Sequence, residues 1–260
     1  HWWHAPLYLT VRGLTTSPIP FGGRTFAVDF DLIEHNLLVR TSDGATRALA
    51  LVPRTVADFH REYLAILDAL GIEVEIEPKP VQTGDTTPFA EDRTHASYES
   101  AHAHEWFRAL VQVDQVLKRF PGGFIGKASP VHLFWGRLDL CVTLFSGRPA
   151  PEARGGDEIA REAYSHEHAG FGFWPGGGSV PAPAFYAYFH PEPRGFREAP
   201  VRPASVRYVA ELAEFSLPYD DVRSARDPAA ALMEFLRSAY EAGTERAGWD
   251  RTALEHEPGR

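Results

Sequence analysis

Histidine, glutamate and tryptophan gather in a few short strings of this sequence, and such side chains can bind a metal ion or transfer protons. The first string begins at His132, which opens an alternating run typical of a strand. A histidine that faces a core needs a hydrogen bond or a metal ion to offset its desolvation. His132 is therefore either a hydrogen-bonded structural residue or a metal ligand, and we predict it as a metal ligand. Asp139 shares its face only if the strand is interrupted, for example by a bulge at Gly136.

A second string, Tyr164-Ser165-His166-Glu167-His168, places three ionisable side chains in a row. Alternate residues of a strand point to the same face, so His166 and His168 would lie side by side. We predict His166 as a metal ligand and Tyr164 as a catalytic residue. Glu167 is predicted as a catalytic carboxylate that serves as a further ligand or as a general base.

The first four residues, His1-Trp2-Trp3-His4, form a third string. Two histidines three apart lie on one face of a helix or straddle a turn. We predict His1 and His4 as metal ligands, and Trp2 and Trp3 as substrate-binding walls that exclude water. The alternative is a chain end whose tryptophans pack on the core.

Aromatic residues further along complete the predicted pocket. Tyr186 and Tyr188 alternate with apolar neighbours and share a strand face with His190. We predict Tyr186, Tyr188, Trp135 and Trp174 as substrate-binding residues. An amphipathic strand with tyrosines on the sheet surface is the structural alternative.

These residues together predict a metal-dependent enzyme that acts on a small, partly apolar molecule in an aromatic-walled cleft. Two histidines and a carboxylate with open positions suit ferrous iron and oxygen chemistry, and the same ligands could hold zinc and activate water. The apolar walls favour iron slightly, and with it an oxidoreductase over a zinc-dependent hydrolase. A non-catalytic module that binds a small molecule and a structural subunit are the alternatives.

The elements that position these residues follow from hydrophobic periodicity. Alternation predicts strands near residues 7–11, 26–31, 36–41 and 46–51, and helical spacing predicts a helix from Thr55 to Leu70. Helices near 100–120 and after Asp227-Pro228 flank strands near 131–145, 164–173, 184–189 and 205–217. We predict an α+β fold with antiparallel sheets, built from two similar β-meander-plus-helix halves, residues 1–80 and 81–260. The helices pack on one face, and the halves form one compact unit with the cleft between them.

Composition excludes several classes of function. The 260 residues are 44% hydrophobic and 23% charged, as in globular proteins. The net charge of −9 argues against nucleic acid, and no apolar run reaches the roughly 20 residues of a membrane span. No phosphate loop or dinucleotide fingerprint occurs, so we expect no nucleotide cofactor. The single cysteine, Cys141, fits a reducing, cytoplasmic location. The oligomeric state, the substrate and the residues upstream of His1 are not predicted.

Several strings carry a resemblance to a known family: HWWHAPLYLTVRGLTTSPIP, FIGKASPVHLFWGRLDL, REAYSHE, GFWPGGG and FYAYFHPEP. In this order they resemble DUF5996, a bacterial family of unknown function, over nearly the whole chain. The resemblance implies no settled activity. It implies that members carry a further segment before the first string. The family string around Tyr164 ends at Glu167, so His168 is not carried into the predicted site.

Overall fold

The computed structural model describes residues 5–80, 84–151, 158–177 and 180–256, which divide into two compact units. Residues 7–111 form the N-terminal unit, and residues 112–260 with Ala5 and Pro6 form the C-terminal unit. The boundary falls inside helix α2 (Ser100–Arg119) and not at residue 80, where we placed it. Phe107 explains the difference, because it is buried in the hydrophobic core of the N-terminal unit.

The N-terminal unit holds an antiparallel sheet of six strands, in the order β1-β2-β4-β5-β6 with β3 paired to β4. The strands are β1 (Tyr8–Leu9), β2 (Gly13–Thr15), β3 (Ile19–Phe21), β4 (Arg24–Asp31), β5 (Asn36–Thr41) and β6 (Thr46–Ala50). Val28 and Val39 face each other across β4 and β5 and are buried. The alternating pattern of the sequence therefore places one face of this sheet in the core.

Helix α1 (Val56–Ala69) follows this sheet and contributes Leu67 to the same core. The Thr55 hydroxyl accepts a hydrogen bond from the Asp58 amide at 3.1 Å, which satisfies one of the free N–H groups of the first turn. The helix ends at Leu70, and Gly71 takes a left-handed conformation with φ of 64°. These are the start and the end that the sequence predicts.

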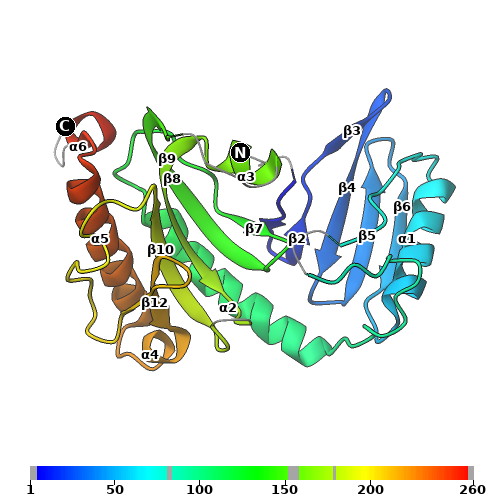
Figure 1. Ribbon diagram of the computed structural model, residues 1–260. Coiled ribbons are helices and arrows are strands. Elements are labelled where there is room, and N and C mark those ends of the chain that lie inside the picture. The colour runs from blue at the N-terminus through cyan, green and yellow to red at the C-terminus, as the bar shows by residue number, and fades with distance from the viewer. Residues whose placement is uncertain (1–4, 81–83, 152–157, 178–179, 257–260) are drawn as a thin grey trace. The chain divides into compact units, whose positions relative to one another are not determined.

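The C-terminal unit also holds an antiparallel sheet of six strands, in the order β11-β12-β10-β9-β8-β7 (Figure 1). The strands are β7 (His132–Phe134), β8 (Asp139–Pro149), β9 (His166–Trp174), β10 (Ala184–His190), β11 (Arg207–Val209) and β12 (Glu214–Pro218). Its helices are α3 (Glu158–Ala163), α4 (Tyr219–Arg223), α5 (Pro228–Ala247) and α6 (Arg251–Leu254). Both sheets are antiparallel and a helix follows each of them, so the predicted α+β class is confirmed, although β11 pairs outside β12 and the second sheet is not a simple meander.

Helix α5 covers one face of this second sheet. The Asp227 carboxylate accepts from the Ala230 amide at 3.0 Å and caps the helix, as its sequence predicts. A Cβ atom at Gly243 would lie 2.0 Å from the Phe189 ring, so the missing side chain lets α5 approach β10. Phe171 is fully buried on this face and contacts Tyr240 of α5. The strand pleat then turns the alternate residues of β8, β9, β10 and β12 to the opposite face.

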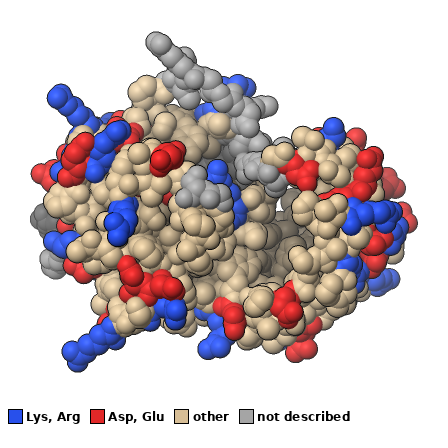
Figure 2. Space-filling model, turned by 60° about the horizontal axis from the view of Figure 1, so that its bottom comes forward, with Lys and Arg blue, Asp and Glu red and all other residues tan. Residues whose placement is uncertain are grey.

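Basic and acidic side chains are interspersed over the face of the molecule that Figure 2 shows. The chain has a net negative charge, but on this face the acidic side chains lie among basic ones. Among the helices that the structure describes, none is both long and apolar enough to cross a membrane.

Candidate functional site

The sheet face opposite α5 in the C-terminal unit carries an unusual number of ionisable and aromatic side chains, and we call it the polar face. Its residues alternate with the buried phenylalanines of the same strands. Its ionisable, polar, aromatic and glycine residues are Asp139, Cys141 and Thr143 of β8, His168, Gly170, Gly172 and Trp174 of β9, Tyr186, Tyr188 and His190 of β10, and Glu214 and Ser216 of β12, and the apolar Phe145 and Ala184 lie on the same face.

Two glycines make room for the tyrosines at the centre of the polar face. Tyr186 pairs with Gly172 and Tyr188 with Gly170 across β10 and β9. A Cβ atom at Gly172 would lie 2.5 Å from the Tyr186 ring, and one at Gly170 would lie 2.3 Å from the Tyr188 ring. Glycine weakens a strand interior, so its presence marks a close approach by another group. Here that group is a phenol ring laid flat over the neighbouring strand.

The Tyr186 hydroxyl donates a hydrogen bond to the Asp139 carboxylate at 2.7 Å. Burial raises the pKa of Asp139, and this hydrogen bond partly opposes the shift. Asp139 lies on the same face as His132 because residues 135–138 form a turn, with Leu138 at a φ of 56°. The sequence left this point open, and the turn decides it.

Glu214 is a second carboxyl group of the polar face whose pKa is raised. Burial raises its pKa to about 7, Arg137 lowers it and Asp139 raises it further. A carboxyl group that titrates near neutral pH can both accept and release a proton, which is what a general acid–base catalyst requires. Arg137 is exposed, and its guanidinium lies 5.9 Å from the centre of the Trp174 ring. It thus holds a positive charge beside Asp139 and Glu214.

The other end of the polar face holds a group of histidines and tyrosines. The Tyr188 hydroxyl lies 3.4 Å from Nε2 of His168. The ring of Tyr164, which follows α3, lies near His168 and His190 at centroid distances of 5.4 and 4.7 Å, tilted against the first ring and edge-on to the second. Burial lowers the pKa of His168 to about 4, so its imidazole is neutral at physiological pH.

His132, the first predicted ligand, is fully buried and its two ring nitrogens already have partners. Nδ1 lies 2.7 Å from the Pro130 carbonyl oxygen and Nε2 lies 3.5 Å from Sγ of Cys141. Burial lowers the pKa of His132, which matches a neutral ring. These contacts are those of a hydrogen-bonded structural histidine, one of the two interpretations that the sequence left open.

The strand register does not bring His132 and His166 together. His132 pairs with Cys141, which pairs with Gly172, and His166 lies six residues before Gly172 on β9. At about 3.3 Å per residue the two histidines are roughly 20 Å apart along the strand. Two ligands of one ion must bring their nitrogens to within about 3–4 Å of each other. His132 and His166 therefore cannot share an ion in this structure.

Glu167 and His166 lie at the exposed start of β9. The Glu167 carboxylate accepts hydrogen bonds from Arg148 at 2.7 Å and from the Ser146 hydroxyl at 2.9 Å. Nδ1 of His166 lies 3.0 Å from the Ser165 hydroxyl. Glu167, the predicted catalytic carboxylate, thus forms an ion pair with Arg148. It lies on the face of the sheet opposite the one that carries Tyr186.

The predicted aromatic residues are divided between several places. Tyr186, Tyr188 and Trp174 lie on the polar face, whereas Trp135 is exposed in the turn between β7 and β8. The predicted ligands and walls at His1, Trp2, Trp3 and His4 lie outside the described residues.

Sequence reasoning missed Glu214 and Arg137. Glu214 carried a usable signal, because it alternates with the apolar Phe215 and Leu217 and so must face away from them. Arg137 carried none, since a turn residue has no periodicity that aims its side chain.

A comparison with protein families matches residues 1–256 to the family of unknown function DUF5996. The chain belongs to this family. The resemblance seen in the sequence strings is thereby confirmed. Neither the curated proteins nor the solved structures include a match to the chain. The function of this DUF5996 member must therefore be argued from its own residues.

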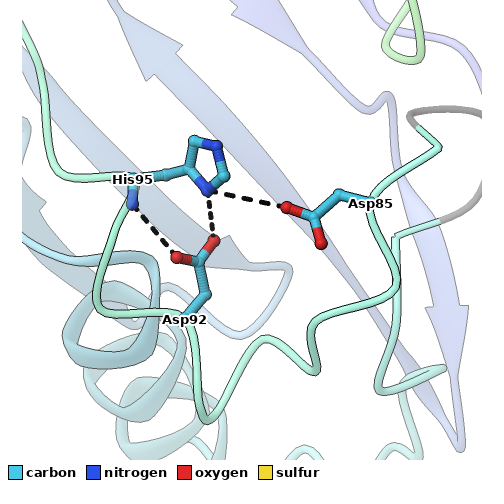
Figure 3. Close-up of side chains that lie close together, drawn as sticks. All are labelled: Asp85, Asp92 and His95. Carbon is cyan, nitrogen blue, oxygen red and sulfur yellow. Dashed lines mark hydrogen bonds and ion pairs between the residues drawn. The ribbon is translucent and has the colours of Figure 1, made fainter.

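The N-terminal unit of this DUF5996 member contains a second group of ionisable side chains: Asp85, Asp92 and His95 (Figure 3). Their ligand atoms lie within 4.8 Å of one another, which is close enough to consider a metal site. Nδ1 of His95, however, lies 2.8 Å from one Asp92 oxygen and 3.9 Å from an Asp85 oxygen. A ring N–H directed at these oxygens satisfies them without an ion.

The backbone contacts of this group indicate a structural role. The other Asp92 oxygen accepts from the Thr94 and His95 amides, both at 3.0 Å. The carbonyls of Asp92 and His95 in turn accept from the first amides of α1, Ala57 and Val56. The group therefore fastens the loop before α2 to the start of α1.

We expect the contribution of His95 to the stability of this loop to depend on pH. The bond to Asp92 raises the pKa of His95, and the pKa of Asp92 is lowered by bonds from His95 and Thr94. The ion pair is therefore fully present between the usual pKa of Asp, 3.8, and that of His, 6.5, and is lost as pH rises through the raised pKa of His95. His95→Ala should destabilise the protein more at pH 5.5 than at pH 8.5 in urea unfolding. An equal loss at both pH values would contradict a charged pair. His60→Ala is the control on α1.

Proposed function

We propose that the chain is an enzyme that moves a proton within a small, partly apolar substrate bound at the polar face, with Glu214 as the acid–base group. The observation that carries the proposal is the shared face itself. Asp139 and Glu214 lie near the charge of Arg137, and the Tyr188 phenol lies near both carboxyl groups on a sheet face where glycines make room for the tyrosines.

The proposed reaction needs no partner molecule for its balance. The Glu214 carboxylate accepts a proton from a C–H bond of the substrate, and the electron pair of that bond stays on the substrate as an enolate or a similar anion. Hydroxyls of the polar face stabilise this charge by hydrogen bonding. Glu214 then returns the proton to a different substrate atom, so one bond to hydrogen breaks and one forms. The overall class is an isomerisation by proton transfer.

Arg137 and Trp174 suggest the kind of substrate. The guanidinium carries a positive charge over the face of an indole, so an anionic group and a flat apolar part can bind side by side. An unsaturated or aryl-substituted keto acid has both features, and the carbon next to its ketone carries a proton acidic enough for a carboxylate base.

The metal-dependent reaction expected from the sequence gains no support from the positions of His132 and His166, because the register separates them. We keep the prediction that the ligand is a small, partly apolar molecule. A non-catalytic binding module is the second candidate, and the arginine laid over Trp174 favours it equally. A cytoplasmic location, and the lack of nucleic-acid and membrane partners, stay predictions.

The test is proton NMR of the purified chain in D₂O with a panel of unsaturated, aromatic and keto carboxylic acids. We expect at least one acid to exchange a C–H for deuterium or to isomerise. Arg137→Gln should raise KM about tenfold with a smaller change in kcat, the equivalent of 1.4 kcal/mol of binding. Arg237→Gln, an exposed arginine on α5, is the control and should leave KM unchanged. Binding without exchange would support the binding module, and a panel without any bound acid would contradict both.

A further inference from the structure

Two histidines lie side by side at one end of the polar face. His168 of β9 and His190 of β10 are directly paired across the strands. Their ring centroids are 5.4 Å apart and the rings are tilted by 34°. Tyr164 packs against both rings, and the Tyr188 hydroxyl reaches His168.

Each histidine is fixed through the same ring nitrogen. Nδ1 of His168 lies 2.9 Å from the His166 carbonyl oxygen. His190 bonds the backbone of Tyr164, and since no described residue pairs with its Nε2, we assign that bond to Nδ1. A neutral ring that donates from Nδ1 carries a lone pair on Nε2. Both rings therefore present an acceptor nitrogen.

The acceptor on His190 has no donor among the described residues, and the acceptor on His168 has one at the long end of the hydrogen-bond range. Nε2 of His190 is buried and has no hydrogen-bond partner in the part of the chain that the structure describes. Nε2 of His168 has a long contact of 3.4 Å with the Tyr188 hydroxyl. A buried polar atom without a partner costs free energy, so its retention calls for an explanation.

We propose that His168 and His190 bind a divalent transition-metal ion through their Nε2 atoms, with the hydroxyls of Tyr188 and Tyr164 near the site. A cation would be the positive partner for the lone pairs on these two adjacent rings, whose centroids are 5.4 Å apart. Protonation is a poor substitute, because burial disfavours a charged ring and each ring would repel the other. Imidazole nitrogen suits zinc, copper and nickel, and a carbonyl bonded to the opposite nitrogen is the usual support of a metal-binding histidine.

Further observations agree with this site. The pKa of both histidines is lowered by burial, to about 4 for His168, so both rings are in the neutral form that binds metals. The site does not depend on Glu214 or on the proposed proton transfer. It also differs from the ligand set expected from the sequence, which used His166 and not His168 or His190.

The test is calorimetric titration of the chelator-treated full chain with Zn²⁺ and with Cu²⁺. We expect about one ion per chain. His168→Ala and His190→Ala should each weaken binding by more than the roughly 10–100-fold that loss of an outer partner costs. His166→Ala is the matched control: it removes an exposed imidazole two residues away but keeps the carbonyl that His168 uses. Circular dichroism establishes that each variant is folded.

A second measurement decides the matter if a variant does not fold. Nitrogen-15 spectra of histidine-labelled parent protein report each ring nitrogen, and Zn²⁺ should shift Nε2 of His168 and His190 while their Nδ1 atoms stay protonated. No ion bound by the parent, unchanged Nε2 signals, or an equal loss of binding in His166→Ala would each overturn the proposal.

Discussion

Glu214→Gln should lower the turnover of any substrate found at the polar face by about 10²–10⁴-fold, the usual contribution of a general acid–base group. Glutamine keeps the size of the side chain and its hydrogen bonding, but it cannot carry the proton. The parent rate, expressed as kcat/KM, should rise through a pH near 7, because burial raises the pKa of Glu214 to about 7 and the base is the ionised form. The variant should lose this dependence.

The same substitution should change how the stability of the folded chain depends on pH, and this can be measured without a substrate. The pKa of Glu214 is raised from 4.5 to about 7 in the folded chain, so between these values the folded state holds a proton that the unfolded state has lost. Stability therefore falls as pH rises from 4.5 to 7 and changes no further from this group above that range. The fall is up to about 3 kcal/mol, since a pKa difference of one between the folded and unfolded states corresponds to about 1.4 kcal/mol.

Urea unfolding at several pH values measures this effect. Glu214→Gln should remove most of the decrease between pH 4.5 and 7 and should be more stable than the parent at pH 8. Glu211→Gln, an exposed neighbour in the β11–β12 turn, is the control and should follow the parent. A parent and a Glu214→Gln variant with parallel pH profiles would show that Glu214 titrates as an ordinary exposed glutamate.

The parts of the fold with local signals could be predicted from the sequence. Thr55 and Asp227 mark two helix starts, and each side chain caps its helix. Strand alternation placed Tyr186 and Tyr188 on one face, which is where they lie. Residues 81–111 were assigned to the wrong half, because nothing local shows that Phe107 packs with β4 and β5.

The site depends on contacts between strands, and these were harder to predict. Whether His132 reaches His166 depends on the register of three strands, which a single sequence does not specify. The pairing of His168 with His190 depends on the same register. The glycines of the string GFGFW did carry a signal, since small residues at alternate positions of a strand indicate a close approach from outside. The structure shows which group approaches, because two tyrosine rings lie over these glycines.

Gly170→Ala and Gly172→Ala should both destabilise the C-terminal unit, by about 1–3 kcal/mol each, because each new methyl group overlaps a phenol ring. At Gly170 the three nearest atoms all belong to the Tyr188 side chain, at 2.3 to 2.8 Å. At Gly172 the methyl group would also lie 2.7 Å from the backbone oxygen of Leu140, which a side-chain movement cannot relieve.

Double-mutant cycles in urea separate these two cases. Truncation of Tyr188 should rescue Gly170→Ala, so the pair Gly170→Ala and Tyr188→Ala should show a favourable coupling within the roughly 0.5–3 kcal/mol seen for residues in contact. Gly172→Ala should be rescued less by Tyr186→Ala, because the clash with Leu140 remains. Equal rescue in the two cycles would mean that the sheet backbone yields at both positions. The glycines would then not be what holds the two phenols in place, and the geometry assigned to the polar face would lose its main support.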